Sequence, residues 1–199
     1  MVAADGTGVR ERLLAATRRC LLDNGFAGLS TRVVADTAGV PLSQIHYHFG
    51  SKQQLVLAVL DAENERLLRR QRALYDQQIP LWKRWEQACD ALEDDLASGY
   101  VRVLQEMIAA GWSDARVSEA VRASLAGWYT LLESVAGEAE ERVGSLGPFT
   151  AGEIAALTAH AFLGAEAVIL LGVTEETVPA RSALRKIGLL LRDIEETGT

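Results

Sequence analysis

The sequence contains few of the residues that build disulfide-linked or membrane-spanning proteins. Its 199 residues include two cysteines, Cys20 and Cys89, which are far apart and each lie in an apolar helical pattern. Isolated thiols of this kind are more typical of small core residues than of a disulfide or a metal site. The longest candidate apolar stretch, around residues 165–173, is about half of the roughly 18 residues that a membrane span needs.

The N-terminus also lacks a sorting signal. Residues 1–8 have neither the basic start nor the apolar stretch of a secretion signal. We therefore expect a short disordered lead over these residues, and a cytoplasmic protein that does not enter a membrane.

Runs of alternating β-branched residues are missing, and the four prolines, at positions 41, 80, 148 and 179, fall at the edges of segments. Proline is excluded from helix interiors and glycine favours helix ends. The sequence therefore predicts an all-α protein, with helices near residues 9–23, 30–37, 41–48, 51–70, 81–98, 100–112, 115–142, 151–172 and 180–196.

Charge is distributed unevenly along the chain. The net charge is −7, yet residues 1–60 contain six Lys or Arg against four Asp or Glu. All the excess negative charge therefore lies after residue 60. Such an asymmetry is compatible with an N-terminal region that faces nucleic acid, although a small positive excess alone is a weak signal.

The segment from Ser30 to Lys52 has the pattern of two short helices joined by a tight turn. Ser30 is a favourable N-cap, and Leu29 and Val34 stand at the two positions of a hydrophobic staple. Gly39 can adopt the positive φ that the turn needs. This is the helix-turn-helix layout, in which the second helix enters the major groove of DNA.

The same segment predicts which side chains are buried and which are exposed. Ala35 and Ala38 are small enough for the two helices to cross closely, above a small core of Val34, Val40, Ile45 and Phe49. The second helix then exposes a face of polar and ring side chains suited to bases and phosphates, formed by Leu42, Ser43, Gln44, His46, Tyr47 and His48.

This region resembles the DNA-binding domain of the TetR/AcrR family over residues 9–60, without a gap. The resemblance is carried by short motifs along the segment: Asn24-Gly25-Phe26, Ser30-Thr31-Arg32, Val34-Ala35, Ala38-Gly39-Val40, Ile45-His46-Tyr47-His48-Phe49 and Ser51-Lys52-Gln53-Gln54-Leu55. One departure is His46, which stands where the family usually has tyrosine. An imidazole still donates to phosphate, with a different reach and charge.

The resemblance implies a role for each matching residue. Thr31, Arg32, Tyr47, His48 and Lys52 would contact phosphates, and His46 belongs to the same set. Ser43 and Gln44 would face base edges, where glutamine pairs bidentately with adenine, and Leu42 would touch a thymine methyl. We therefore expect a helix-turn-helix DNA-binding domain over residues 9–55, with double-stranded operator DNA as its partner.

The resemblance further implies that residues 56–199 form a domain that binds a small-molecule effector and dimerises. Aromatic and soft side chains recur on the inward faces of its helices, and as a set they suit an apolar or aromatic ligand. The expected effector site comprises Trp82, Trp85, Cys89, Tyr100, Met107, Trp112, Trp128, Tyr129 and Phe162. Taken singly, each is more typical of ordinary core.

The last two expected helices predict a homodimer interface. Residues 151–172 are rich in small side chains that allow close helix approach, and residues 180–196 supply leucine and isoleucine. This is more apolar area than one bundle face needs, and self-association would bury it. Two recognition helices would also read two half-sites about one DNA turn apart.

No pattern predicts catalysis, a metal or a cofactor. His46 and His48 lie on different helix faces with no Cys, Asp or Glu close by, and His160 stands alone in an apolar segment. We therefore expect an effector-controlled regulator and not an enzyme. A repressor is favoured by the resemblance, and a ligand-responsive activator stays open. A helical small-molecule carrier or enzyme is disfavoured because no catalytic cluster is found, and a protein-interaction module fits the basic, aromatic recognition face less well.

Overall fold

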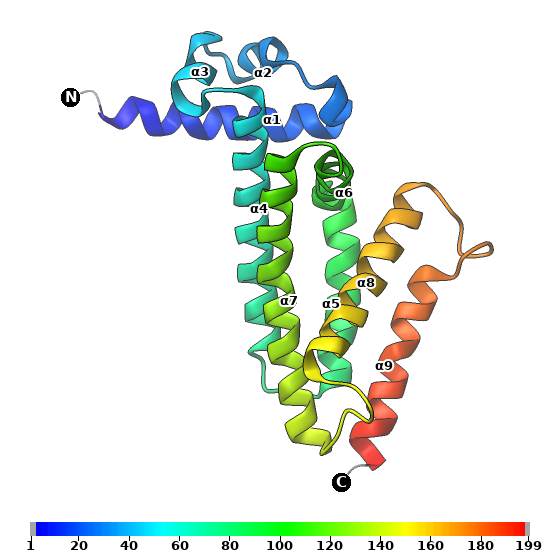
Figure 1. The fold of residues 1–199 in the computed structure, drawn as a ribbon. Coiled ribbons are helices and arrows are strands. Elements are labelled where there is room, and N and C mark those ends of the chain that lie inside the picture. The colour runs from blue at the N-terminus through cyan, green and yellow to red at the C-terminus, as the bar shows by residue number, and fades with distance from the viewer. Residues whose placement is uncertain (1–2, 198–199) are drawn as a thin grey trace. The chain divides into compact units, whose positions relative to one another are not determined.

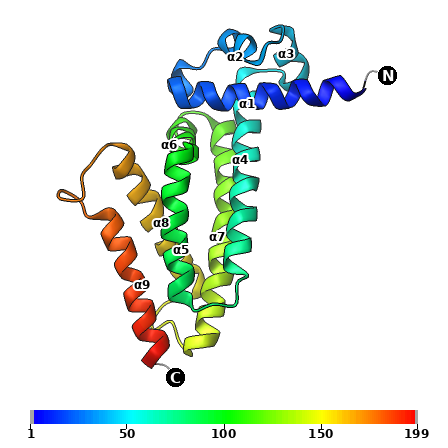
Figure 2. The ribbon, with the colours of Figure 1, turned by 180° about the vertical axis from the view of Figure 1, so that it is seen from behind.

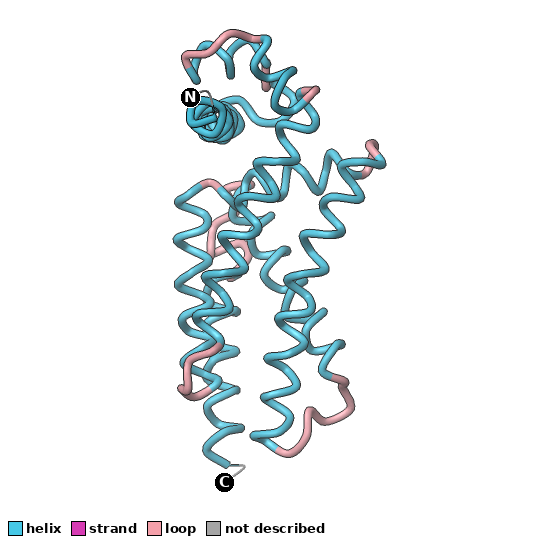
Figure 3. Tube along the Cα trace, turned by 90° about the vertical axis from the view of Figure 1, so that its left-hand side faces the viewer, coloured by secondary structure: helices cyan, strands magenta, loops and turns pink. Residues whose placement is uncertain are grey.

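The computed structural model describes residues 3–197, and side chains from residue 8 onward. Over these residues the chain consists of α-helices and their connections, with no strand (Figure 3), which confirms the predicted all-α class. The helices are α1 (Ala3–Gly28), α2 (Thr31–Ala38), α3 (Ser43–Phe49), α4 (Lys52–Tyr75), α5 (Leu81–Ser98), α6 (Tyr100–Gly111), α7 (Ala115–Val143), α8 (Ala151–Leu170) and α9 (Ala180–Thr197).

The first helix differs from its expected range at both ends. It begins at Ala3, whereas the sequence predicts a helix start near Val9 after a disordered lead, and residues 1–2 lie outside the described residues. Near its other end the helix is interrupted at Gly25, whose φ of 69° and ψ of 176° are not helical. This is where Asn24-Gly25 was expected to end it.

The chain divides into two compact units. Unit 1 comprises residues 1–65 and 102–122, and unit 2 comprises residues 66–101 and 123–199. The boundary expected from the sequence lay at residues 55–56. The first part of α4, most of α6 and the start of α7 belong to the same unit as the N-terminal helices, and each contributes buried apolar residues, among them Leu55, Met107 and Val117.

Unit 1 is built around the small helices α2 and α3, which pack on α1 (Figure 1). Leu13, Leu21, Val34, Ile45 and Leu55 are at most 2% exposed and form its interior. Thr17 is also buried, and its hydroxyl donates to the Leu13 carbonyl at 2.6 Å, so this polar group is satisfied within α1. The recognition elements therefore rest on a packed base.

Unit 2 is a layered helical bundle in which α9 lies along α5 and also contacts α8 (Figure 2). Its core cluster comprises Cys89, Leu92, Trp128, Leu132, Ala155, Ala159, Phe162, Ala165 and Leu184. The first turn of α5 is capped from α9, since the Glu195 carboxylate accepts the backbone N–H groups of Leu81 at 2.9 Å and Trp82 at 3.1 Å. These hydrogen bonds link the start of α5 to the last turns of α9.

The helix α8 is more apolar than the run of residues 165–173 suggested. By length and mean hydropathy, which reaches 1.5, it could cross a membrane, and 28% of the apolar window is buried within the chain. Thr158, His160 and Glu166 interrupt the apolar sequence of α8, while its alanine, leucine, isoleucine, valine and phenylalanine residues keep the mean hydropathy high. A single helix of this kind is weak evidence of a membrane span, and it leaves an apolar surface that is not covered by this chain.

Candidate functional site

The turn between α2 and α3 has the geometry that the sequence predicted. Gly39 adopts the left-handed conformation, with φ 65° and ψ 39°, and its N–H donates to the Asp36 carbonyl at 3.1 Å. The Val40 N–H donates to the Ala35 carbonyl at 3.0 Å. Ser30 is the N-cap of α2, in an extended conformation, but its side chain makes no capping hydrogen bond.

The packing beneath this turn leaves the outer face of α3 free. Val34 and Ile45 are fully buried, and Ala35 and Ala38 are buried where α2 packs, while Val40 and Phe49 are half-buried. The guanidinium of Arg10 lies 5.5 Å from the centre of the Phe49 ring and covers the end of α3. The expected small core is therefore present, with its last two members at the rim.

The predicted recognition face of α3 is largely exposed. Tyr47 is 82% exposed and Leu42 is 37% exposed. Ser43 and His46 are also exposed, whereas Gln44 and His48 are half-buried. The rings of Tyr47 and His48 meet edge to face with centroids 5.0 Å apart. In α2, Arg32 is exposed and Thr31 is half-buried, so polar side chains of both helices face solvent.

His46 already has one partner within the chain. Its Nδ1 lies 3.2 Å from the Gly50 carbonyl, with Nδ1 as the donor in that bond. The contact orients the ring at the end of α3, where Gly50 has a φ of 75° and ends the helix. The other ring nitrogen, Nε2, is then the atom directed away from this contact.

Lys52, at the start of α4, is engaged with the turn that follows α1. Its ammonium donates to the Phe26 carbonyl at 3.2 Å and lies 5.3 Å from the centre of the Phe26 ring. The side chain is half-buried. A lysine held in this way stabilises unit 1 locally, and its positive charge also stands at a helix N-terminus, which favours anions.

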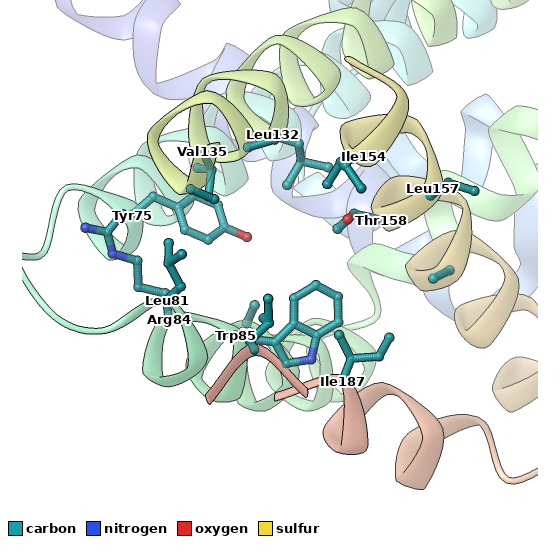
Figure 4. A pocket seen from close by; sticks show the side chains of 15 residues that line it. Tyr75, Leu81, Arg84, Trp85, Leu132, Val135, Ile154, Leu157, Thr158 and Ile187 are labelled. Carbon is teal, nitrogen blue, oxygen red and sulfur yellow. The ribbon is translucent and has the colours of Figure 1, made fainter. Parts of the chain in front are cut away.

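Unit 2 contains a cavity of about 430 Å³ with an almost wholly apolar wall (Figure 4). The end of α4, α5, α7, α8 and α9 each contribute to it. Its lining residues are Tyr75, Leu81, Arg84, Trp85, Ala88, Leu132, Val135, Ala136, Ala139, Ile154, Leu157, Thr158, Ala161, Ile187 and Leu191. A cavity of this volume suits a molecule of drug-like size.

One charged side chain, Arg84, takes part in the wall, and it is 2% exposed. Its guanidinium donates to both carboxylate oxygens of Glu138, at 2.7 and 3.0 Å, and to the Gln77 carbonyl at 2.6 Å. Hydrogen bonding to Arg84 is the main reason that the pKa of Glu138 lies below its ordinary value of 4.5. Glu138 also accepts from Arg142 at 2.5 Å, so one carboxylate serves two guanidinium groups.

Of the nine side chains expected at the effector site, Trp85 is the one that lines this cavity. Cys89, Trp128 and Phe162 belong to the unit 2 core, and Tyr100 and Met107 are buried elsewhere. Tyr129 is hydrogen-bonded to His160 at 3.0 Å, and Trp82 lies beneath the ammonium of Lys83. Trp112 is 82% exposed. Apolar periodicity finds the inward faces of helices, and most of those faces fill with core.

The side chains that the sequence analysis missed are mainly ordinary aliphatic residues and two hydroxyls. Tyr75 ends α4 directly before a turn, and Thr158 interrupts the apolar sequence of α8. The sequence does contain a signal for Thr158, because it is a polar residue within an apolar helix at a position where no helix cap or turn requires a hydroxyl. Nothing in the spacing distinguishes Leu132, Val135 or Ile187 from core.

Known proteins match this chain either over a short N-terminal or partial stretch of sequence or, by structure, over most of its length. Residues 13–59 match the family described as bacterial regulatory proteins, tetR family. The HTH-type transcriptional repressor AcnR of Corynebacterium glutamicum is 31% identical over 61 residues, which is 31% of this chain and 32% of that protein. The chain therefore matches about a third of the length of these curated relatives.

Solved structures extend the likeness to the whole chain. A TetR transcription regulator from Haloarcula marismortui has a TM-score of 0.74 and 22% identity, covering 90% of this chain and 96% of that one. The transcriptional regulator FadR from Bacillus subtilis, in complex with stearoyl-CoA, has a TM-score of 0.72 and 11% identity, covering 91% and 96%. These likenesses show that both units share the fold of these regulators.

Proposed function

We propose that this chain is a transcriptional repressor of the TetR type, because residues 13–59 match the family described as bacterial regulatory proteins, tetR family, and a repressor is 31% identical to it over 61 residues. It binds operator DNA as a homodimer through α2 and α3 of each copy, and a small molecule in the unit 2 cavity weakens that binding. The observation that carries the proposal is the exposed face of α3, held outward by the Gly39 turn and the buried Ile45.

The chemistry of this face suits DNA. Arg32 and Tyr47 are exposed donors for phosphate oxygens, and Thr31 lies in the first turn of α2, where backbone N–H groups also favour an anion. Ser43 and Gln44 are positioned in the first turn of α3 for base edges, with Leu42 beside them for a thymine methyl. His46, His48 and Lys52 supply further donors around the same segment.

A homodimer is supported by the uncovered apolar surface of α8 and α9. Leu157 is 55% exposed, and on α9 Leu190 and Ile194 are 63% and 48% exposed. Other apolar side chains of the same two helices, including Phe162 and Leu184, are buried within the chain. The proposed interface therefore uses the outward face of the two helices, and burial of that face offsets the cost of association.

Effector control is supported by the cavity and by α4. One end of this helix begins at Lys52 in unit 1, and the other ends at Tyr75 on the cavity wall in unit 2. A ligand that prefers a different position of Tyr75 therefore acts on the helix that carries Lys52. Such a coupling is typically worth about 1–3 kcal/mol.

The test is a gel-shift titration with the DNA that neighbours the protein's own gene. A palindromic duplex should shift, and Tyr47→Ala should weaken binding to every duplex by about tenfold with a shallower dependence on salt. Gln44→Ala should instead relax the preference at one base position, at a cost of about 1–3 kcal/mol for the preferred base. Arg116→Gln, which removes an exposed cation of unit 1 outside the matched residues, is the control and should bind normally.

Two results would count against the proposal. One is a protein that ignores every duplex at low salt, where phosphate contacts are strongest. The other is equal loss on all operator variants for Gln44→Ala, which would mean that Gln44 reads no base. Repression and activation are distinguished by a reporter gene behind the shifted duplex, since a repressor lowers expression and the alternative, an activator, raises it.

A further inference from the structure

The polar atoms of the unit 2 cavity are few, and most are already used within the protein. The indole N–H of Trp85 donates to the Leu184 carbonyl at 2.7 Å. The guanidinium of Arg84 is held by Glu138 and Gln77, and in Figure 4 its nitrogen end lies beyond the Tyr75 ring, away from the open space. The Nε of Arg84 has no hydrogen-bond partner, but it is buried within the wall and has almost no accessible surface, so a ligand cannot reach it. Neither group is therefore available as the main contact for a ligand.

Two hydroxyl groups remain, and they stand on opposite walls. The phenol oxygen of Tyr75 points into the cavity from the end of α4, and the hydroxyl of Thr158 faces it from α8 (Figure 4). Neither has a hydrogen-bond partner anywhere in residues 3–197. A hydroxyl in an apolar wall without a partner costs free energy until an acceptor or donor reaches it.

We propose that this cavity binds an uncharged, mainly apolar molecule whose carbonyl or hydroxyl oxygen bonds to Tyr75 and Thr158. The inference rests on the proposed function, because it names the chemical class of the effector. The aliphatic lining residues then pack against the apolar body of the ligand, with the Trp85 indole as its largest flat contact.

Charge on the ligand is disfavoured by the composition of the wall. No carboxylate and no lysine occur among the lining residues. The cluster of Arg84, Glu138 and Arg142 has one net positive charge, and solvent screens it at Arg142, which is 29% exposed, donates to the Ile79 carbonyl and does not line the cavity. A charged group in the cavity would lose its hydration without a partner.

The protonation of Tyr75 agrees with this chemistry. Burial raises its pKa to about 12, so the phenol keeps its proton at neutral pH and donates a hydrogen bond. Donation requires an acceptor on the ligand, which an uncharged ketone, ester or alcohol supplies. A phenolate that would attract a cation does not form under these conditions.

The experiment compares four probes of one shape by isothermal titration calorimetry on the full-length, DNA-free protein. The probes are 2-acetylnaphthalene, naphthalene, 2-naphthoate and trimethyl(2-naphthyl)ammonium. We expect the neutral ketone to bind at least about tenfold more tightly than either ion, because each ion is desolvated without compensation. Naphthalene should bind more weakly than the ketone by the contribution of two hydrogen bonds.

The variants Tyr75→Phe and Thr158→Val each remove one of the two hydroxyls while keeping the shape of the cavity wall. Each should weaken binding of the ketone about five- to tenfold, as expected for one hydrogen bond, and change naphthalene binding by less than about twofold. Tyr129→Phe is the matched control, because it removes a phenol oxygen that bonds to His160 and does not line the cavity. It should leave both affinities unchanged.

Several outcomes would overturn the inference. They are tighter binding of the naphthoate, tighter binding of the ammonium ion, no effect of either hydroxyl variant, or no binding of any probe up to its solubility. Since the titration contains no DNA, it is independent of operator binding. A protein that binds the ketone as expected and shifts no duplex would contradict the proposed repressor function while supporting the cavity's chemistry.

Discussion

The carboxylate of Glu106 on α6 accepts the backbone N–H of Phe26, the residue that follows the break in α1. Arg102, one turn earlier in α6, donates to the Leu22 carbonyl at 2.8 Å and to Glu106 at 3.2 Å. Two side chains of α6 thus satisfy backbone groups on both sides of Gly25. Within unit 1, the end of α1 is therefore fixed by α6, next to the turn that leads into α2.

This contact makes Gly25 a position where a side chain is not tolerated. Its φ of 69° is unfavourable for other residues, and a Cβ there would stand 3.0 Å from both carboxylate oxygens of Glu106. Gly25→Ala should lower the free energy of unfolding by about 1–3 kcal/mol, measured by urea denaturation. The control is Gly137→Ala within α7, where the new Cβ meets nothing within 4 Å. Gly137→Ala should raise the free energy of unfolding slightly. Equal effects of Gly25→Ala and Gly137→Ala on the free energy of unfolding would contradict the role of Glu106.

The second prediction concerns the double role of Lys52. Lys52→Met keeps the apolar stem and removes the hydrogen bond to Phe26 and the charge above its ring. The free energy of unfolding should fall by about 1 kcal/mol. If Lys52 also contacts phosphate, operator binding should weaken on all sequences and the slope of log affinity against log salt should decrease by about one. A reduced stability with an unchanged slope would assign Lys52 to the protein interior alone.

Local signals explain why the DNA-binding end could be predicted from the sequence and the cavity could not. Gly39, Ala38 and Ile45 act within a few residues of one another, so a turn, a close crossing and a buried contact can be inferred from spacing. Trp128 and Leu132 stand four residues apart on the same helix face, yet the first is core and the second is also cavity wall. That difference depends on where α8 and α9 cross α7, which no local pattern encodes.

The third prediction is a pH dependence that arises from Glu138. Its pKa is lowered in the folded protein, chiefly by the hydrogen bond from Arg84, so the stabilisation it provides is fully present above its ordinary value of 4.5. That stabilisation is lost as the pH falls through the lowered folded value. At pH 7, Glu138→Gln should reduce the free energy of unfolding by about 1–3 kcal/mol, because it leaves buried Arg84 without its counter-ion.

The measurement is urea unfolding of both proteins between pH 7 and pH 3. The difference in free energy of unfolding between the native protein and Glu138→Gln should become smaller as the pH drops below 4.5, since protonation removes the same charge that the substitution removes. Glu141→Gln, at an exposed position of the same helix, is the control and should give a small gap at every pH. A gap that stays constant down to pH 3 would mean that the Arg84 contact does not depend on the charge of Glu138.

The last prediction addresses the uncovered face of α9. Leu190 and Ile194 are one turn apart and thus lie on one side of the helix, whereas Arg192 lies on the other side. Replacing Leu190 and Ile194 together by glutamate should place two desolvated charges in the proposed interface and convert a dimer into a monomer in sedimentation velocity. The monomer should keep its helical circular dichroism and bind operator DNA at least about a hundredfold more weakly, since one recognition helix contacts one half-site. Arg192→Glu should remain dimeric. A double variant that still sediments as a dimer would place the interface on another surface.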